Sequence, residues 1–232
     1  MPTSLILPVA ADKEEYKGEM PYLFRLDRKG IMICLAAIKG LELDKFDGVY
    51  ITILKKHNDI YKLEDLLDLQ FRRLGIADKA HVVELETPTK SQPETVYLTI
   101  KKNAITGGVF VKDADSYFEA DFPVENSVCI YPLDSLKRVN PQDKSYVNVD
   151  DMYYVTNIIE KRILGRDFCA GGYFFEKADE FCTLYEGLLG YAPLYISHII
   201  YAALLKGITF RPVRVRNYKD WGTYKDWREN ER

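Results

Sequence analysis

The sequence predicts a single α/β domain built on a mixed, mostly parallel sheet flanked by helices. Over residues 1–120, short apolar runs of strand length alternate with periodic segments of helix length. After residue 120 strands dominate, with helices returning only near the end. Neither an internal repeat nor a low-complexity linker interrupts the 232 residues. We therefore expect residues 1–232 to form one domain.

The first half contains four expected strands and three expected helices. Ile31, Leu35 and Ile38 are spaced as on one helix face, and Gly40 is a typical helix stop. The segment before Gly75 is a strongly periodic amphipathic helix. Continuous apolar runs such as GVYITIL and GVFVK are typical of strands buried on both faces. The expected strands cover residues 4–10, 48–54, 81–85 and 108–112, and the expected helices cover 31–41, 63–74 and 94–102.

The second half is expected to extend the same sheet. Its apolar runs predict strands over residues 127–132, 146–149, 153–159, 172–175 and 209–215, and its helical patterns cover 177–189 and 196–206. The chain thus divides into a parallel half and a mixed half without a second core.

Composition excludes several functional classes. The formal net charge is -3, which argues against the positive field needed to bind nucleic acid or a membrane surface. The longest apolar stretch, residues 191–205, is interrupted by Pro193 and is too short to span a bilayer. The four widely spaced cysteines and the lack of a signal-peptide pattern predict a cytoplasmic protein.

The most informative motif is Asp113-Ala114-Asp115, which directly follows the apolar run GVFVK. In open α/β sheets, ligands bind beyond the carboxyl ends of the strands. If the backbone stays extended, Asp113 and Asp115 share a face and can approach one cation. Carboxylate oxygens suit Mg²⁺ or Mn²⁺. An acidic turn or helix cap is the alternative interpretation of the same residues.

A second acidic residue, Asp220, lies near the C-terminus in the segment YKDWGT. Gly222 permits a tight turn directly after it. Alone, this segment is typical of an ordinary loop. Asp220 gains a function only if the fold places it beside Asp115.

Taken together, the motifs resemble those of the sugar-phosphate and choline-phosphate nucleotidyltransferases. The resemblance spans nearly the whole chain and depends on the order of its parts. In sequence order these are LILPVAA at 5–11, QPETV at 92–96, VKDADSYF at 111–118, IIEK at 158–161, AGGYF at 170–174 and DWGT at 220–223. It implies a Rossmann-like, GT-A type fold with a nucleotide-binding half (1–120) and an acceptor-binding half (121–232).

The resemblance also implies roles for individual residues. Asp115 and Asp220 would bind the catalytic Mg²⁺ (or Mn²⁺), and with Lys161 they form the expected catalytic set. A nucleoside triphosphate and a small phosphorylated acceptor would be the partners; the oligomeric state stays open. Glu160, Lys161 and Gly172 would contact the acceptor, whereas Ala10, Ala11, Lys13, Gln92, Thr95 and Asp113 would contact the nucleotide.

The first loop departs from the family pattern, which is rich in glycine and is followed by a Pro-Lys pair. Residues 10–18 contain three carboxylates and one glycine, and Pro21 is followed by Tyr22. Two alternatives therefore stay open. One is a glycosyltransferase that binds a nucleotide-sugar through Asp113-Ala114-Asp115, and the other is a non-catalytic nucleotide-binding relative.

Overall fold

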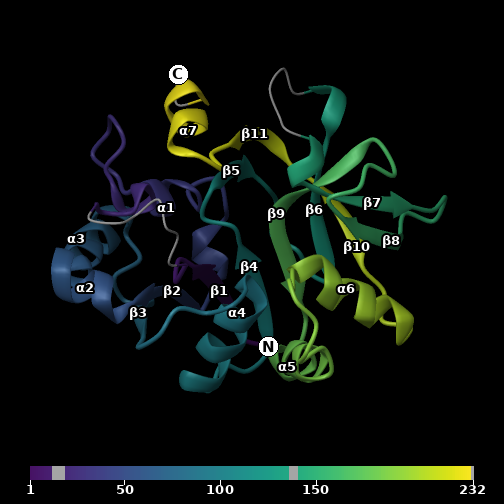
Figure 1. Cartoon of the computed structure of the whole chain (residues 1–232), viewed down its shortest axis with the longest axis horizontal. Helices are drawn as coiled ribbons and strands as arrows, with labels where there is room; N and C mark the ends of the chain where they lie inside the picture. The colour runs from purple at the N-terminus through teal and green to yellow at the C-terminus, as the bar shows by residue number, and fades with distance from the viewer. Residues whose placement is uncertain (12–18, 136–140, 231–232) are drawn as a thin grey trace.

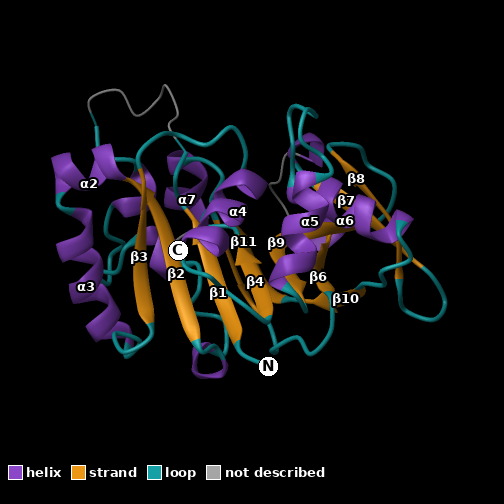
Figure 2. Cartoon of the chain, turned by 90° about the horizontal axis from the view of Figure 1, so that it is seen from below, coloured by secondary structure: helices purple, strands orange, loops and turns teal. Residues whose placement is uncertain are grey.

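Figure 1 shows the computed structural model, which describes residues 1–11, 19–135 and 141–230. A nine-stranded sheet crosses the molecule in the order β10-β6-β9-β4-β1-β2-β3, with β7 paired to β9 and β8 paired to β7 (Figure 2). Its strands are β1 (Thr3–Pro8), β2 (Gly48–Leu54), β3 (Ala80–Leu85), β4 (Gly108–Lys112), β6 (Ser127–Pro132), β7 (Ser145–Val149), β8 (Val155–Glu160), β9 (Asp167–Phe175) and β10 (Arg211–Arg214).

The sheet is parallel in its first half and mixed in its second. β1 pairs in parallel with both β2 and β4, and β2 pairs in parallel with β3. β9 then runs antiparallel to β4 and to β6, and β10 runs parallel to β6. The predicted α/β fold class, with one sheet continued by the second half, is confirmed.

The molecule has two hydrophobic cores, one on each face of the sheet, and alternate side chains along each strand pack into one or the other. Leu5 and Leu7 pack in one core, whereas Ile6 packs in the other, because successive strand residues point to opposite faces. α4 (Gln92–Lys102), α5 (Ala178–Glu186) and α6 (Ile196–Leu205) cover the Ile6 face. α1 (Ile33–Ala36) and α3 (Leu63–Leu74) contribute to the Leu5 face, and α2 (Lys55–Tyr61) adjoins α3. None of the helices in the described residues has the length and hydrophobicity needed to cross a bilayer.

A small two-stranded sheet, which the sequence patterns did not predict, lies on the Leu5 face. β5 (Ser116–Glu119) follows β4 after a turn and pairs antiparallel with β11 (Arg216–Asp220). The last described helix is α7 (Tyr224–Asn230) (Figure 1). Its Trp227 is buried in the same core. This sheet joins a segment of the first half to the end of the chain.

The helix expected over residues 31–41 is much shorter, because α1 covers only Ile33–Ala36. Every residue from Ile31 to Ile38 is buried, so the apolar spacing reflects a buried segment rather than one face of a long helix. Gly40 is required by close packing. A Cβ atom at this position would lie 2.0 Å from the carbonyl oxygen of Phe118 in β5.

We predict that Gly40→Ala lowers the free energy of unfolding by about 3 kcal/mol, because the added methyl group must push β5 away. Urea unfolding measures the change. Gly187→Ala is the matched control, since the nearest atoms to its Cβ would lie at an ordinary 3.5 Å. Equal unfolding midpoints for the two variants would contradict the close approach of Gly40 to β5.

Candidate active site

A cleft of about 950 Å³ opens at the carboxyl ends of β1 and β4. From β1 the sheet continues through β2 on one side, while β4 lies on the other side, so the cleft occupies the switch point where α/β sheets bind ligands. Residues from both halves of the chain line it, including Val9, Asp115, Lys161 and Asp220.

The pairing of β5 with β11 brings the two predicted metal carboxylates to the same cleft. Asp220 is the register partner of Ser116, and the Trp221 N–H donates a 2.8 Å hydrogen bond to the Asp115 carbonyl oxygen. Both Asp115 and Asp220 line the cleft. The sequence-based expectation that Asp220 lies beside Asp115 therefore agrees with the geometry.

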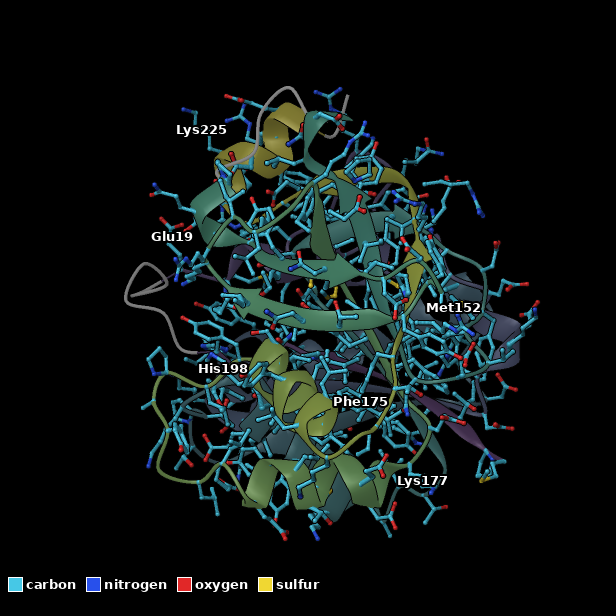
Figure 3. All side chains as sticks on the ribbon, turned by 90° about the vertical axis from the view of Figure 1, so that its right-hand side faces the viewer. Glu19, Met152, Phe175, Lys177, His198 and Lys225 are labelled. Atoms are coloured by element: carbon cyan, nitrogen blue, oxygen red, sulfur yellow. The ribbon has the colours of Figure 1, made fainter. Side chains whose placement is uncertain are left out.

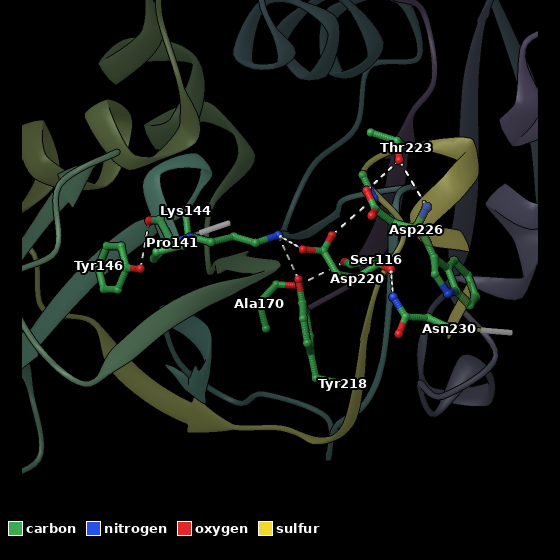
Figure 4. Close-up of polar contacts among 12 residues, drawn as sticks. Ser116, Pro141, Lys144, Tyr146, Ala170, Tyr218, Asp220, Thr223, Asp226 and Asn230 are labelled. Carbon is green, nitrogen blue, oxygen red and sulfur yellow. Dashed lines mark hydrogen bonds and ion pairs between the residues drawn. The ribbon is translucent and has the colours of Figure 1, made fainter. Parts of the chain in front are cut away.

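The environments of these two carboxylates differ. Among the described residues, the Asp115 carboxylate has no hydrogen-bond or ion-pair partner. The Asp220 carboxylate is held on both oxygens: Oδ2 lies 2.8 Å from Lys144 Nζ, and Oδ1 accepts a 3.1 Å hydrogen bond from the Gly222 N–H (Figure 4). Asp115 is thus open to a ligand, whereas Asp220 is already paired.

Asp113 and Asp115 lie in a turn between β4 and β5, so the extended backbone considered for them is not observed. Asp113 accepts a 2.6 Å hydrogen bond from Gln92 Nε2 at the start of α4. Burial raises the pKa of the Asp113 carboxyl to about 6, and the neighbouring Asp115 charge adds to the effect.

Gly171 of β9 shapes the floor beneath Asp113. The Asp113 N–H donates a 2.8 Å hydrogen bond to the Gly171 carbonyl oxygen. The φ angle of Gly171 is +87°, and a Cβ atom there would lie 2.5 Å from Asp113 Oδ2. Glycine is therefore needed for both backbone conformation and space.

The turn is supported from below by Lys112, a fully buried lysine. Its ammonium donates hydrogen bonds to the Asp113 carbonyl (2.7 Å), the Ser116 carbonyl (2.8 Å) and Ser116 Oγ (2.9 Å), and it lies 4.4 Å from the Phe118 ring centroid. Burial lowers the pKa of Lys112 to about 8, although the charges of Asp113 and Asp115 oppose this shift. Lys112 thus fixes the shape of the turn that carries both aspartates.

Glu160, an expected acceptor residue, ends β8 and Lys161 follows it. β8 packs on α6, the helix that carries His198 (Figure 3). The Lys161 side chain is exposed, and its Nζ donates a 3.0 Å hydrogen bond to the Tyr195 hydroxyl. Glu160 Oε2 accepts hydrogen bonds from Ser197 Oγ (2.6 Å) and from Ser145 Oγ. Both residues line the cleft, with Glu160 bonded to α6 as well as to β7.

Three predicted site residues lie next to the cleft without lining it. Ala10 is buried against Leu54 and Leu85. Thr95 Oγ1 shares a 2.6 Å hydrogen bond with another threonine hydroxyl. Gly172 faces the core, where a Cβ atom would lie 2.7 Å from the Phe118 ring.

Their neighbours Ala11, Gln92 and Gly171 line the cleft. The structure thus places some of the predicted nucleotide and acceptor residues along the cleft and others beside it, and which way each residue points depends on the fold. Lys13, which was expected to contact the nucleotide, lies outside the described residues.

Sequence reasoning missed Lys144, which precedes β7 and belongs to none of the motifs. Its Nζ contacts Asp220 and lies 3.0 Å from the Tyr218 hydroxyl. Burial alone would lower the pKa of Lys144, but its interactions with Tyr218 and Asp220 outweigh burial and raise it. Lys144 is therefore a cation that lines the cleft.

The position after Pro21 also has an unexpected function. Tyr22 is buried and donates a 2.7 Å hydrogen bond from its hydroxyl to the Trp221 carbonyl oxygen. It thereby anchors the segment after Pro21 to the segment that carries Asp220. A side chain used in this way does not replace a phosphate-binding lysine.

Asp115 and Asp220 could hold a magnesium ion if a bound ligand supplied further oxygens. No cluster of three or more His, Cys, Asp or Glu side chains suited to a metal ion occurs within residues 1–11, 19–135 and 141–230. Two carboxylates are nevertheless sufficient when substrate phosphates supply the remaining oxygens, as is typical for Mg²⁺. The open carboxylate of Asp115 and the oxygen-only donor set match this cation better than a zinc ion.

We predict that Asp113→Asn stabilises the metal-free protein at pH 7.5 by about 2–3 kcal/mol. The folded state binds a proton at Asp113 more tightly than the unfolded state does, with a pKa of about 6 against about 3.9. Ionisation of Asp113 therefore reduces stability as the pH rises from 4 to 6, and asparagine removes this loss.

Urea unfolding in EDTA measures this stability difference between pH 4 and pH 8. The advantage of Asp113→Asn should shrink as the pH falls through 6 toward 4. Asp68→Asn, on the exposed face of α3, should show no such pH dependence. A constant difference across this range would show that the Asp113 carboxyl is not responsible.

The sequence and the fold of this chain were compared with those of known proteins. Neither a protein-family model nor a curated protein matches the sequence. Among solved structures, a nucleoside-diphosphate-sugar pyrophosphorylase from Vibrio cholerae RC9 is similar with a TM-score of 0.80 and 15% identity, covering 98% of this chain and 99% of that chain.

Two further structures show the same likeness. The inositol-1-phosphate CTP transferase from T. maritima has a TM-score of 0.74 and 16% identity, covering 97% of this chain and 91% of that one. A UDP-glucose pyrophosphorylase complexed with UDP-glucose has a TM-score of 0.74 and 12% identity, covering 100% and 97%. The chain therefore has, over its full described length, the fold of the sugar-phosphate nucleotidyltransferases.

Proposed function

We propose that this protein is a metal-dependent nucleotidyltransferase. It would join a nucleoside monophosphate from a nucleoside triphosphate to a small phosphorylated acceptor, a sugar-1-phosphate or phosphocholine-like molecule, with release of pyrophosphate. The observation that supports this most strongly is the convergence of Asp115 and Asp220, from opposite halves of the chain, in one cleft. The fold shared with pyrophosphorylases supports the same reaction class.

The reaction requires little acid–base chemistry from the protein. An oxygen of the acceptor phosphate attacks the α-phosphorus, forming a new P–O bond, and the bond from that phosphorus to the bridging oxygen breaks. The leaving pyrophosphate retains the electron pair of that bond. Because the second pKa of a phosphate monoester is about 6, the nucleophile is already ionised near neutral pH. Positioning and charge neutralisation therefore supply most of the rate enhancement.

The described residues divide this work between the two sides of the cleft. On the acceptor side, the exposed Lys161 ammonium would hold the acceptor phosphate, and Glu160 would bind a polar group of the acceptor. On the nucleotide side, Ala11, Gln92 and Asp113 line the cleft beside β1 and α4. Asp115 and Asp220 would hold Mg²⁺ (or Mn²⁺), which neutralises triphosphate charge when bound.

A cytoplasmic location is part of this proposal, since nucleoside triphosphates are available there. All four cysteines are buried and free, which suits a reducing compartment.

We predict that pyrophosphate is released when the protein is incubated with Mg²⁺, a nucleoside triphosphate and a suitable phosphorylated acceptor. Asp115→Asn and Asp220→Asn should each lower kcat by about 100-fold, because each removes a carboxylate that holds the cation. A coupled pyrophosphate assay over four triphosphates and a panel of acceptors measures both effects.

Asp68→Asn is the control for these substitutions, because this exposed side chain lies on α3. Transfer or hydrolysis of a nucleotide-sugar without pyrophosphate release would contradict the proposal and favour the glycosyltransferase alternative. Tight nucleotide binding without turnover under any condition would favour a non-catalytic relative.

A further inference from the structure

The Lys144 side chain is held by the residue expected to bind the metal. Lys144 lies between a short 3-10 turn (Pro141–Asp143) and β7, where its carbonyl oxygen accepts a 3.0 Å hydrogen bond from the Lys161 N–H. Its Nζ lies 2.8 Å from Asp220 Oδ2 and 3.0 Å from the Tyr218 hydroxyl (Figure 4). Only 16% of the Lys144 side chain and 15% of the Asp220 side chain are exposed. This contact is therefore little screened by solvent.

A divalent cation at Asp220 would have to displace this ammonium. Asp220 Oδ1 accepts the Gly222 hydrogen bond and Oδ2 is bound to the ammonium, so a divalent cation on either oxygen meets the positive charge of Lys144. Two positive groups cannot share this largely buried carboxylate without strong repulsion. The Asp115 carboxylate has no such competitor among the described residues. Before a metal binds, the Asp220 carboxylate is thus paired with Lys144, whereas the Asp115 carboxylate has no cation bound among the described residues.

A displaced Lys144 would need another anion, because an unpaired ammonium is costly in a largely buried position. Within the described part of the cleft, the lining cations are Lys90, Lys144 and Lys161. Lys90 is exposed at the rim, and Lys161 is assigned to the acceptor. The flexible four-carbon stem of Lys144 allows its ammonium to turn from Asp220 to a phosphate entering the same cleft.

We propose that Lys144 is an exchangeable phosphate-binding cation, which pairs with Asp220 in the empty cleft and moves to a substrate phosphate when a divalent cation takes Asp220. This inference rests on the proposed function, since it assigns Asp220 to the metal. In this role Lys144, which belongs to none of the sequence motifs, would bind a phosphate of the triphosphate. It also couples the binding of metal to the binding of phosphate at a single side chain.

The exchange makes two predictions of opposite sign for Lys144→Met. Affinity for Mn²⁺ alone should increase about tenfold, because the competitor for Asp220 is removed. Affinity for inorganic pyrophosphate in the presence of Mn²⁺ should decrease about tenfold, because the released cation is missing. Electron paramagnetic resonance of free Mn²⁺ measures the first affinity, and titration calorimetry measures the second.

Matched variants separate exchange from a purely structural ion pair. Lys144→Arg keeps the charge and should bind Mn²⁺ alone as weakly as the wild type. Lys206→Met should leave Mn²⁺ affinity unchanged, because this exposed lysine at the end of α6 is not among the described residues that line the cleft. If Lys144→Met does not fold, Lys144→Gln replaces it, since its amide lacks the charge but can still donate to Asp220.

Unchanged or weaker Mn²⁺ binding by the folded uncharged variant would overturn the exchange, whatever the enzyme's turnover. Opposite shifts in the two affinities would support it even if no acceptor were converted, and in that case only the proposed reaction would fail. Wild-type protein that binds no Mn²⁺ even with pyrophosphate would overturn both the exchange and the metal-dependent function.

Discussion

The antiparallel pairing of β5 with β11 is the constraint on which the cleft depends. It ties a turn of the first half to the last strand of the chain, and the hydrogen bond from Trp221 to the Asp115 carbonyl completes it. The close approach of Gly40 to β5 and the bond from Tyr22 to Trp221 fix this small sheet against the core. The large sheet alone would not bring the two aspartates together. Asp115 lies in the turn after β4, and Asp220 lies in β11, which is not a strand of the large sheet.

Positively and negatively charged side chains alternate around this small sheet. The buried ammonium of Lys112 holds the turn from within, Asp113 and Asp115 lie above it, and Lys144 neutralises Asp220 across the cleft. Lys112 is held by backbone carbonyls and a hydroxyl, Asp113 by the Gln92 amide, and Asp220 by Lys144, as buried charges require. The Asp115 carboxylate is the exception, because no other described residue forms a hydrogen bond or ion pair with it, and such a carboxylate in a cleft is a typical feature of a ligand site.

Much of the fold was predictable from local patterns. The apolar run GVFVK and the periodic segment before Gly75 appear as β4 and α3 with the predicted bounds, because their burial depends on adjacent residues. β5 and β11 were not predicted, since their short sequences contain no continuous apolar run and they become strands by pairing with each other. The shortened α1 was missed because a fully buried segment has no polar face to reveal its period. Lys144 was missed for a related reason: its contact with Asp220 joins residues that are remote in sequence.

The central claim, that Asp115 and Asp220 hold one cation together, is tested most directly by crystallography with Mn²⁺ and a non-hydrolysable nucleoside triphosphate. Anomalous scattering from manganese locates the ion independently of its ligands. If the two aspartates hold one cation, the map contains a single peak within about 2.3 Å of oxygens from both carboxylates and from the triphosphate. A manganese ion bound elsewhere, or a nucleotide bound with Asp220 still paired to Lys144, would contradict it.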